Sequence, residues 1–377
     1  MIHPKNSQLK LNMKKVILPI CVLLSGIGIS KAQSAKIDTS LQISGSVDMY
    51  YRYDFAEGKN INSPEIGNVG MKQNSLEFGM LDLKLKKKLG SIIANAELAF
   101  GQRETPDASA PPSYNIQNLT ATYEVNNKLS FTGGIMYRYQ SFERLTSADN
   151  FHYTMSLGFI NQNFVRSAGI KATYAFDDKN KLSLGLYNSN DSKNGGNRTL
   201  ASPGYGLSDI CMQGFFTDPF GAKGLDVRTA IWVEGQKQNG WHSNLQLRYQ
   251  LAKKWHLGFD MTNLSGADSL VAVKNYNSYV GYLQYNFCKP FTAGIRYDYL
   301  DRTESDIISN NIVKEKYSTF TITGAYKINN LTLKAEYKAD MTEDKNVNTP
   351  YIDKNGNATS KAAEVVVAAV FTFQPFQ

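Results

Sequence analysis

The sequence predicts an all-β protein, a transmembrane antiparallel β-barrel of about 16 strands, and three observations lead to this fold class. The chain begins with a segment that has the features of an export signal. The rest of the chain alternates polar and apolar residues with period two, the pattern of strands with one wet and one dry face. The connections between these strands are alternately short and long, which is typical of outer-membrane barrels.

The first 32 residues predict a signal peptide. Met13–Lys15 is a basic n-region, Val16–Ile29 is apolar, and Ser30–Ala32 places small residues at the −3 and −1 positions of a cleavage site. We therefore expect cleavage after Ala32 and a barrel over residues 33–377. Met13 is an alternative start of the chain.

Two other interpretations of this segment are disfavoured, a retained membrane anchor and a lipoprotein. A retained membrane anchor is disfavoured because the apolar run is shorter than the roughly 20 residues that a spanning helix needs. A lipoprotein would use Cys21, but Ile20 precedes it where a small residue is expected. After Ala32 the sequence has no apolar run of helical spanning length, so later membrane insertion requires strands, because only helices and closed barrels satisfy their backbone groups in lipid.

The segment Leu41–Phe55 shows the alternation most clearly. One face holds Ile43, Gly45, Val47, Met49, Tyr51, Tyr53 and Phe55, and the other holds Ser44, Ser46, Asp48, Tyr50, Arg52 and Asp54. Because successive side chains of a strand point to opposite faces, this pattern indicates a strand. The same pattern recurs in 129–139, 168–176, 244–251, 255–262 and 331–338. In residues 76–85 the apolar phase changes near Met80, which predicts a bulge or a partly apolar lumen there.

The connections give the strand count. Short ones use mostly turn-forming residues and lie at 87–90, 126–127, 178–180, 218–224, 252–254, 288–290 and 328–330. Long ones lie at 55–73, 103–115, 140–166, 188–208, 235–243, 263–277, 300–316 and 340–363. Seven short turns join 14 strands, and the first and last strands make 16, an even number that places both chain ends on the periplasmic side.

The polar strand faces predict the residues that line the lumen. Charged side chains on the lipid-facing side would be costly, so they are expected to point inward to water or to partners. The candidates are Asp48, Arg52, Glu97, Glu124, Arg138, Lys171, Arg228, Glu234, Arg248, Asp260, Arg296, Asp298, Lys334, Glu336 and Lys338. The alternative is that these charges only neutralise one another across strands and have no part in transport.

The long connection at 140–166 is apolar for an exposed loop. We expect it to fold into the lumen and to form a constriction that includes Tyr153 and Phe159, because a 16-stranded barrel is too wide for its wall side chains to fill. The alternative is that the connection prolongs the neighbouring strands above the membrane.

Other classes of function find little support. The formal charge of +8 includes five lysines within residues 1–32, so the remaining chain carries +3, which is no basis for nucleic-acid binding.

No phosphate-binding loop, zinc motif or nucleophile elbow is present, and we expect no catalysis, no cofactor and no metal. A barrel hydrolase would use His256 beside Asp260. Cys211 and Cys288 show no metal-ligand spacing, and their pairing is left open.

Three stretches resemble a known family: Ile43–Phe55, Ile116–Glu124 continuing into Leu129–Phe142, and Arg166–Phe176. They are similar to the OmpL-like β-barrel porins of Gram-negative outer membranes. The resemblance implies an outer-membrane channel, and it transfers no catalytic residue and no defined substrate.

The function expected from these observations is a porin that lets small hydrophilic solutes diffuse passively or with weak selectivity. The alternative is a non-transporting surface barrel, an adhesin or receptor that uses its long external loops. A soluble secreted β-sandwich is the rival fold. The expected partners are membrane lipid, lipopolysaccharide and the barrel-assembly machinery. The last strand ends in aromatic residues (Phe371 and Phe373, then Phe376 before the terminal Gln377), which resembles the signal that this machinery reads, and the alternative is an ordinary edge strand. The oligomeric state is left open.

Overall fold

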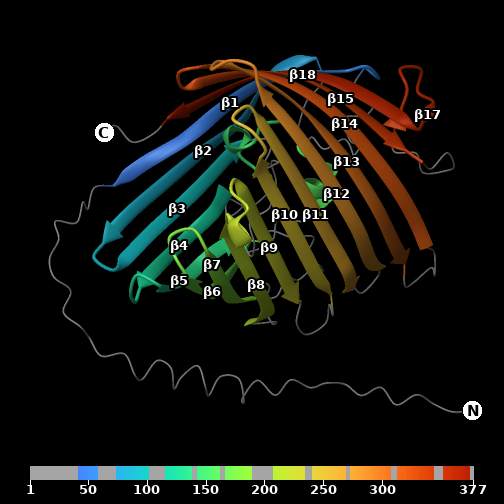
Figure 1. Ribbon diagram of the computed structural model, residues 1–377. Helices are drawn as coiled ribbons and strands as arrows, with labels where there is room; N and C mark the ends of the chain where they lie inside the picture. Colours follow the sequence, from blue (N-terminus) through green and yellow to red (C-terminus); the bar gives the residue numbers. More distant parts are fainter. Residues whose placement is uncertain are drawn as a thin grey trace, which may run out of the picture. The chain divides into compact units, whose positions relative to one another are not determined.

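The computed structural model places the chain in one closed antiparallel β-barrel (Figure 1). It describes residues 41–57, 74–101, 115–137, 142–161, 166–188, 207–233, 240–268, 272–306, 312–343 and 351–373. The predicted signal peptide and its cleavage site lie outside the described residues and stay predictions.

Sixteen strands form the barrel, and two more form a separate hairpin, β16–β17. The described residues also include three short helices. The barrel strands are β1 (Gln42–Asp54), β2 (Ser75–Leu89), β3 (Ile92–Gly101), β4 (Ile116–Glu124), β5 (Leu129–Tyr137), β6 (Arg166–Ala175), β7 (Lys181–Asn188), β8 (Leu207–Thr217), β9 (Leu225–Val233), β10 (Trp241–Gln250), β11 (Trp255–Asp268), β12 (Ala272–Asn286), β13 (Phe291–Asp306), β14 (Ile312–Ile328), β15 (Leu331–Thr342) and β18 (Lys361–Phe373). The other elements are β16 (Tyr351–Ile352), β17 (Ala358–Thr359), α2 (Leu157–Asn161), η3 (Ser147–Asp149) and η5 (Pro219–Gly221).

The barrel is closed by the first and last of its strands. β1 pairs with β18, with Val47 opposite Phe371 and Arg52 opposite Val366, and it pairs with β2 on its other side. Every other barrel strand pairs with the barrel strands that come before and after it in the sequence; β15 thus pairs with β18, because β16 and β17 lie outside the barrel. Closure leaves no sheet edge, so the ladder itself satisfies the backbone groups that a lipid environment would otherwise leave unpaired. The predicted fold class and strand number are confirmed.

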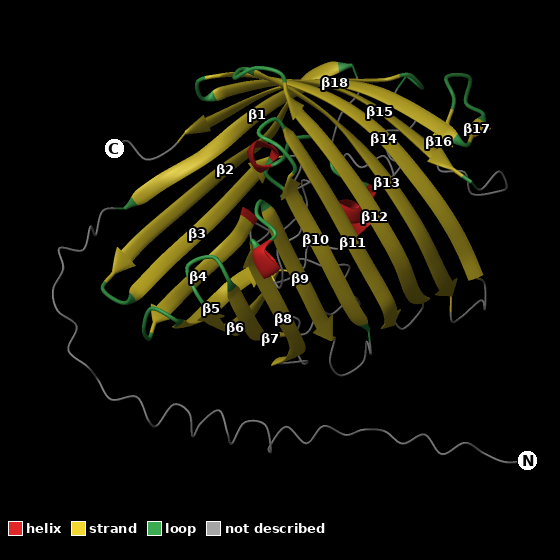
Figure 2. Ribbon diagram, in the orientation of Figure 1, coloured by secondary structure: helices red, strands yellow, loops and turns green. Residues whose placement is uncertain are grey.

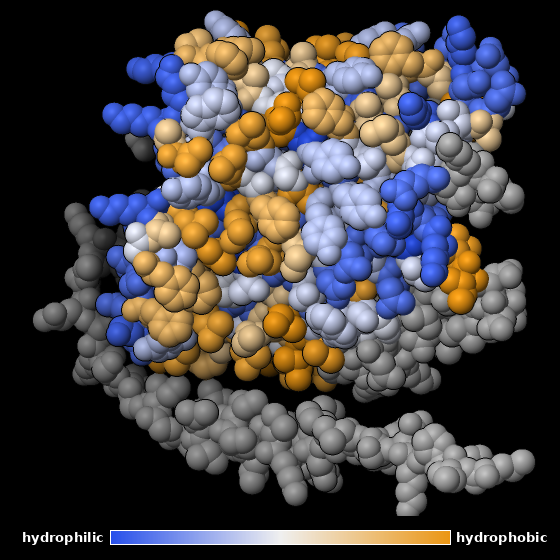
Figure 3. All heavy atoms as spheres, turned by 45° about the vertical axis from the view of Figure 1, so that its right-hand side comes forward, coloured by the Kyte–Doolittle hydropathy of each residue, from blue (hydrophilic) through white to orange (hydrophobic). Residues whose placement is uncertain are grey.

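The two faces of each strand divide as the alternation predicted. In β1, Asp48, Tyr50 and Arg52 are buried inside the barrel, whereas Met49 and Tyr51 are exposed on the outer wall. The outer wall carries large apolar side chains on nearly every strand, and Figure 3 shows hydrophobic residues gathered over much of it. At the rim formed by the short turns, aromatic rings meet one another. Trp255 and Tyr285 have ring centroids 4.5 Å apart, as in the interfacial girdle of a membrane barrel.

A bulge in β2 accounts for the untidy phase of that strand. Asp48 is paired with Met80 and Met49 with Phe78, so Gly79 is the extra residue. Before the bulge Leu76 and Phe78 point outward. After it Met80 and the even-numbered residues that follow point inward. The predicted bulge near Met80 is therefore confirmed.

All seven predicted short turns join consecutive strands. Three of the predicted long connections are wrong, because β11 and β12 extend through most of 263–277, β13 and β14 extend into 300–316, and 340–363 contains β16, β17 and the start of β18. The outer face becomes polar at Asn277, Asp301 and Lys316. Strands that rise above the apolar belt have water on both faces, so they lose the alternation that marks a strand in the sequence. Of the helices within the described residues, none has the length and apolar character needed to cross a bilayer.

The outer wall gives a test of its lipid contact. Ile322 lies on the outer face near the middle of β14, and Ile328 lies on the same face at the strand's end. Ile322→Arg should lower the free energy of unfolding in lipid vesicles by about 2–4 kcal/mol, whereas Ile328→Arg should cost about 0–1 kcal/mol, because the penalty falls toward the interface. Denaturant titration of the refolded variants measures both values, and equal costs at the two positions would contradict a lipid-facing outer wall.

Candidate functional site

The described part of the third long connection, Phe142–Asn161, lies against the inner wall of the barrel, and we call it the inward segment. It contains η3 and α2, and α2 contacts β11, β12, β13 and β14 (Figure 2). Tyr153, Met155, Leu157 and Phe159 are all buried. Such burial needs partners for the polar backbone of the segment, and inward-facing side chains of the barrel supply them.

Glu336 of β15 is the main acceptor for this backbone. Its two carboxylate oxygens accept hydrogen bonds from the backbone N–H groups of Tyr153 (2.8 Å) and Thr154 (3.0 Å). The hydroxyl groups of Thr154 and Thr323 also donate to it. One carboxylate therefore satisfies two backbone donors that would otherwise be buried without a partner.

Arg296 of β13 is the corresponding donor. Its Nη1 donates to the backbone carbonyl of Thr154 (2.6 Å) and its Nη2 to that of Met155 (3.1 Å). The same guanidinium forms ion pairs with Asp298 (2.9 Å) and Glu143 (3.1 Å). A fully buried guanidinium is tolerable only with such a complete set of acceptors.

Three further wall residues hold the segment. Asp298 accepts from the backbone N–H of Leu157 at 3.0 Å, and Lys334 Nζ donates to the carbonyl oxygens of Ser147 and Asn150 at 2.8 and 2.6 Å. Asp48 of β1 accepts from the Tyr153 hydroxyl at 2.5 Å. This last contact needs a glycine beside it, because a Cβ at Gly79 would overlap the Asp48 carboxylate.

Apolar side chains of the segment enter two clusters. Phe159 and Met155 pack with Leu145 and with Met80 and Ala99 of the wall. In the other cluster Leu157 packs with Leu264, Tyr276, Leu300, Tyr317 and Tyr351. Burial of these side chains removes apolar surface from water and adds to the polar anchors.

The inner wall is thereby divided into two sides. We call the inner faces of β1, β11–β15 and β18 the covered wall, and those of β2–β10 the open wall. Every predicted lumen charge on the covered wall is at most 6% exposed; these are Asp48, Arg52, Asp260, Arg296, Asp298, Lys334, Glu336 and Lys338. The predicted charges described on the open wall all keep partial exposure; these are Glu97, Glu124, Lys171, Arg228 and Arg248.

Away from the segment, the covered wall is neutralised by ion pairs. Arg52 is paired with Glu364, and Lys338 lies 2.8 Å from Asp340 and 3.9 Å from Glu364. The open wall has pairs of its own. Lys84 lies 3.0 Å from Asp149 of the segment and 3.7 Å from Glu97, and Lys88 lies 2.6 Å from Glu124.

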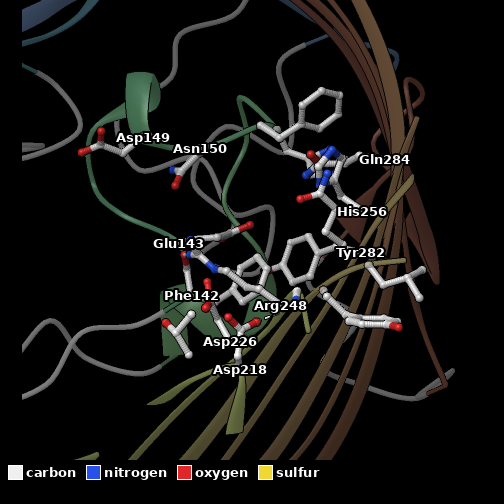
Figure 4. Close-up of a pocket in the computed structure, with 18 residues that line it drawn as sticks. Phe142, Glu143, Asp149, Asn150, Asp218, Asp226, Arg248, His256, Tyr282 and Gln284 are labelled. Atoms are coloured by element: carbon white, nitrogen blue, oxygen red, sulfur yellow. Dashed lines mark hydrogen bonds between the residues drawn. The ribbon is translucent and has the colours of Figure 1, made fainter. Parts of the chain in front are cut away.

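A cavity of about 520 Å³ separates the inward segment from part of β9–β12 (Figure 4). Its lining includes Phe142, Asp226, Arg248, His256 and Tyr282. Arg248 Nη2 donates to the Phe142 carbonyl at 2.5 Å, and its guanidinium lies 4.4 Å from the centroid of the Phe142 ring. Polar and charged groups thus face a hollow large enough for several water molecules or a small solute.

Two titratable groups of the inward segment are perturbed. Burial, and then the positive charges of Arg296 and Lys334, lower the pKa of His152 well below its ordinary value. The neutral ring is 2.7 Å from the Thr323 hydroxyl. Burial, and then the positive charge of Arg228, also lower the pKa of Arg144.

The structure brings the predicted lumen residues to the inner wall with two exceptions, Arg138 and Glu234, which lie outside the described residues. Five further charged residues were not predicted: Glu143, Arg144, Asp82, Lys84 and Glu364. The change of phase at the bulge left the faces of Asp82 and Lys84 ambiguous, and Glu364 directly follows the predicted connection 340–363, whose last residues form the start of β18. No sequence pattern marked Glu143 or Arg144, because a loop has no period from which a facing direction follows.

His256 and Asp260, the pair that a barrel hydrolase would use, have separate hydrogen-bond partners. His256 Nε2 lies 3.1 Å from Asn286 Nδ2, whereas Asp260 accepts from Asn244 at 2.7 Å and from the Phe142 N–H at 3.3 Å. The described residues hold no group of three or more His, Cys, Asp or Glu arranged for a metal ion. Cys211 is buried and Cys288 is exposed, and no disulfide joins them.

The Glu336 anchor can be tested by hydrogen exchange. Glu336→Ala removes the acceptor of two backbone N–H groups, at a cost of about 3 kcal/mol, because hydrogen bonds to a charged group contribute about 1.5–3 kcal/mol each. The amides of Tyr153 and Thr154 should therefore exchange about a hundredfold faster. Glu343→Gln, which changes an exposed carboxylate paired with Lys316, should leave them unchanged. Equal protection in Glu336→Ala and the parent would show that the segment is held by other contacts.

Solved structures similar to this barrel are outer-membrane proteins. The outer membrane channel DcaP of Acinetobacter baumannii has a TM-score of 0.59 and 13% sequence identity, covering 91% of this chain and 100% of that one. OmpT of Vibrio cholerae has a TM-score of 0.55 at 11% identity, covering 90% and 99%. The anion-selective porin from Comamonas acidovorans has a TM-score of 0.55 at 14% identity, covering 89% and 99%. At these identities the likeness shows a shared fold.

Among curated protein sequences, none matches the chain significantly. A family model does. The model described as "Putative beta-barrel porin-2, OmpL-like" matches residues 40–373, which include all the described strands. The family and the fold point to a channel rather than an enzyme. The chain therefore belongs to the OmpL-like beta-barrel porin-2 family and is an outer-membrane β-barrel.

Proposed function

We propose that the chain forms an aqueous channel through which small hydrophilic solutes diffuse passively and with weak selectivity. The observation that carries this proposal is the division of the inner wall. The predicted lumen charges described on the open wall keep contact with solvent, whereas those on the covered wall are buried. Water and solutes would pass between the inward segment and the open wall.

The inward segment sets the width of this passage in the proposal. A barrel of 16 strands encloses more space than its wall side chains can fill. The segment occupies part of that space, and its contacts with Glu336, Arg296 and Asp48 hold it against one side. Tyr153 and Phe159, the two predicted constriction residues, are both buried within these contacts. They would therefore hold the constriction in place from the side of the covered wall and would not touch a passing solute.

The second candidate is a surface barrel that binds a partner and transports nothing. It is favoured by the long strands on one side of the molecule, because β12, β13 and β14 have 15, 16 and 17 residues. These strands exceed the 9–11 residues that a membrane requires and raise their ends above it. The two candidates differ in one measurement: the purified, refolded protein conducts ions across a planar bilayer only if it is a channel.

The remaining partners follow from the location of the barrel. Lipid would contact the apolar outer wall, and lipopolysaccharide would contact the strand ends on the side of the long connections. The barrel-assembly machinery would bind the last strand, β18, whose outer face ends with Phe371 and Phe373. The contacts with lipopolysaccharide and with the barrel-assembly machinery can be examined by crosslinking during assembly of the protein in an outer membrane.

The constriction is tested by removal of part of the inward segment. Deletion of Thr154–Asn163 takes away the residues whose backbone is held by Glu336 and Arg296, so the passage should widen. The single-channel conductance of the refolded variant in a planar bilayer should rise above that of the parent.

A matched control removes a different connection. Deletion of Asp353–Asn357, the tip of the β16–β17 hairpin, removes a turn that is stabilised within itself by Asp353. This variant should keep the conductance of the parent. An unchanged conductance after deletion of Thr154–Asn163 would refute the constriction, and an absence of conductance in the parent would refute the channel.

A further inference from the structure

Two arginines on the open wall lie close together without a carboxylate partner. Arg228 on β9 faces Gln246 across the ladder, and Arg248 on β10 faces Asp226, so the two arginines are diagonal neighbours on one face. Diagonal neighbours in an antiparallel pair are about 7–8 Å apart, within the reach of long side chains. Among the described residues, no carboxylate oxygen lies within ion-pair distance of either guanidinium.

Arg248 is held in place by aromatic contacts. Its guanidinium lies over the Phe142 ring, and that ring stacks on Tyr282 with centroids 4.2 Å apart. Nη2 is occupied by the Phe142 carbonyl. The Nε–H is buried and has no hydrogen-bond partner among the described residues. A buried, unpartnered N–H on a cation costs free energy that an acceptor from a solute would recover.

The inward segment brings a third guanidinium toward this pair. Arg144 is close enough to Arg228 for the positive charge of Arg228 to lower the pKa of Arg144, after the larger effect of burial. The acids nearby include Asp226 opposite Arg248, and Glu97 and Asp149, which both lie within ion-pair distance of Lys84. Glu143 and Asp218 also line the cavity, and they lie within ion-pair distance of Arg296 and Lys179. Positive charges on β9, β10 and the segment are therefore near enough to influence one another, and Arg248 among them lines the cavity.

We propose that Arg228 and Arg248 form a binding site for the oxyanion group of a small solute on the open side of the passage. The inference rests on the proposed channel and names the class of solute that it favours, small carboxylates or phosphates. A guanidinium offers a planar fork of donors that matches a carboxylate or phosphate in two parallel hydrogen bonds. An anion placed here relieves the repulsion between Arg228 and Arg248 and supplies an acceptor to Arg248.

The first test is ion selectivity in a planar bilayer under a KCl gradient. The reversal potential of the refolded parent should show chloride more permeant than potassium. Arg228→Gln should lower the ratio of chloride to potassium permeability by about fivefold, because one unit charge at about 8 Å in water changes the permeability of each ion by about twofold and in opposite directions. Lys86→Gln is the matched control, since it removes one positive charge from the inner face of β2 outside this site, and it should change the ratio less.

The second test separates a specific site from a general positive field. Acetate and inorganic phosphate, added separately, should reduce the chloride current in the parent. Arg248→Lys keeps the charge but loses the fork of donors, so the reversal potential should persist while the effect of the added oxyanion is lost. A stronger effect of phosphate assigns the site to phosphates, and a stronger effect of acetate assigns it to carboxylates.

The results of these tests separate the oxyanion site from the channel on which it rests. A parent protein that conducts no ions overturns the channel and the solute class together. A parent that conducts but prefers potassium, or in which Arg228→Gln and Lys86→Gln shift the reversal potential equally, overturns the oxyanion site alone. Insensitivity of the parent current to both acetate and phosphate also overturns it.

Discussion

The closure of β1 on β18 is the constraint on which the other features of the structure depend. In hydrocarbon no water is present to pair with the backbone, so each N–H and C=O must find its partner within the sheet. A ladder with 16 strands and no edge meets that requirement. It also forces every strand to show one face to lipid and one to the lumen, and it encloses a lumen wider than the wall side chains can fill.

The inward segment fills part of this lumen, and most of the hydrogen bonds that hold its backbone come from the covered wall. The covered wall presents acceptors and donors at matching positions: Glu336 for two N–H groups, Arg296 for two carbonyl groups and Asp298 for a third N–H. The inner face of β18 adds apolar contacts, because Val366, Ala368 and Val370 pack with Tyr153. On the opposite side Lys171 and Arg228 remain in contact with solvent. This asymmetry of the wall is the basis of the proposed passage.

Much of the barrel could be predicted from the sequence, because a strand with lipid on one side and water on the other alternates apolar and polar residues. The turns followed from residues such as Asn126 and Asn127, and the bulge from the change of phase at Met80. The extensions of β11–β14 could not be predicted, because Asn277 and Lys316 face water on the outside and the alternation ends there. The contact of Tyr153 with Asp48 is also invisible in the sequence, because 105 positions separate the two residues and a loop has no period.

The bulge at Gly79 divides β2 into two pieces of opposite parity. The leucines after the bulge occupy odd positions on the outer wall, whereas Leu76 and Phe78 before it reach the same wall from even positions. Loss of this one glycine would leave the strand in a single phase. Either the first piece would turn its apolar side chains toward water, or the second would turn Asp82 and Lys84 toward hydrocarbon. One residue without a side chain therefore keeps two otherwise incompatible halves of a strand on a common surface.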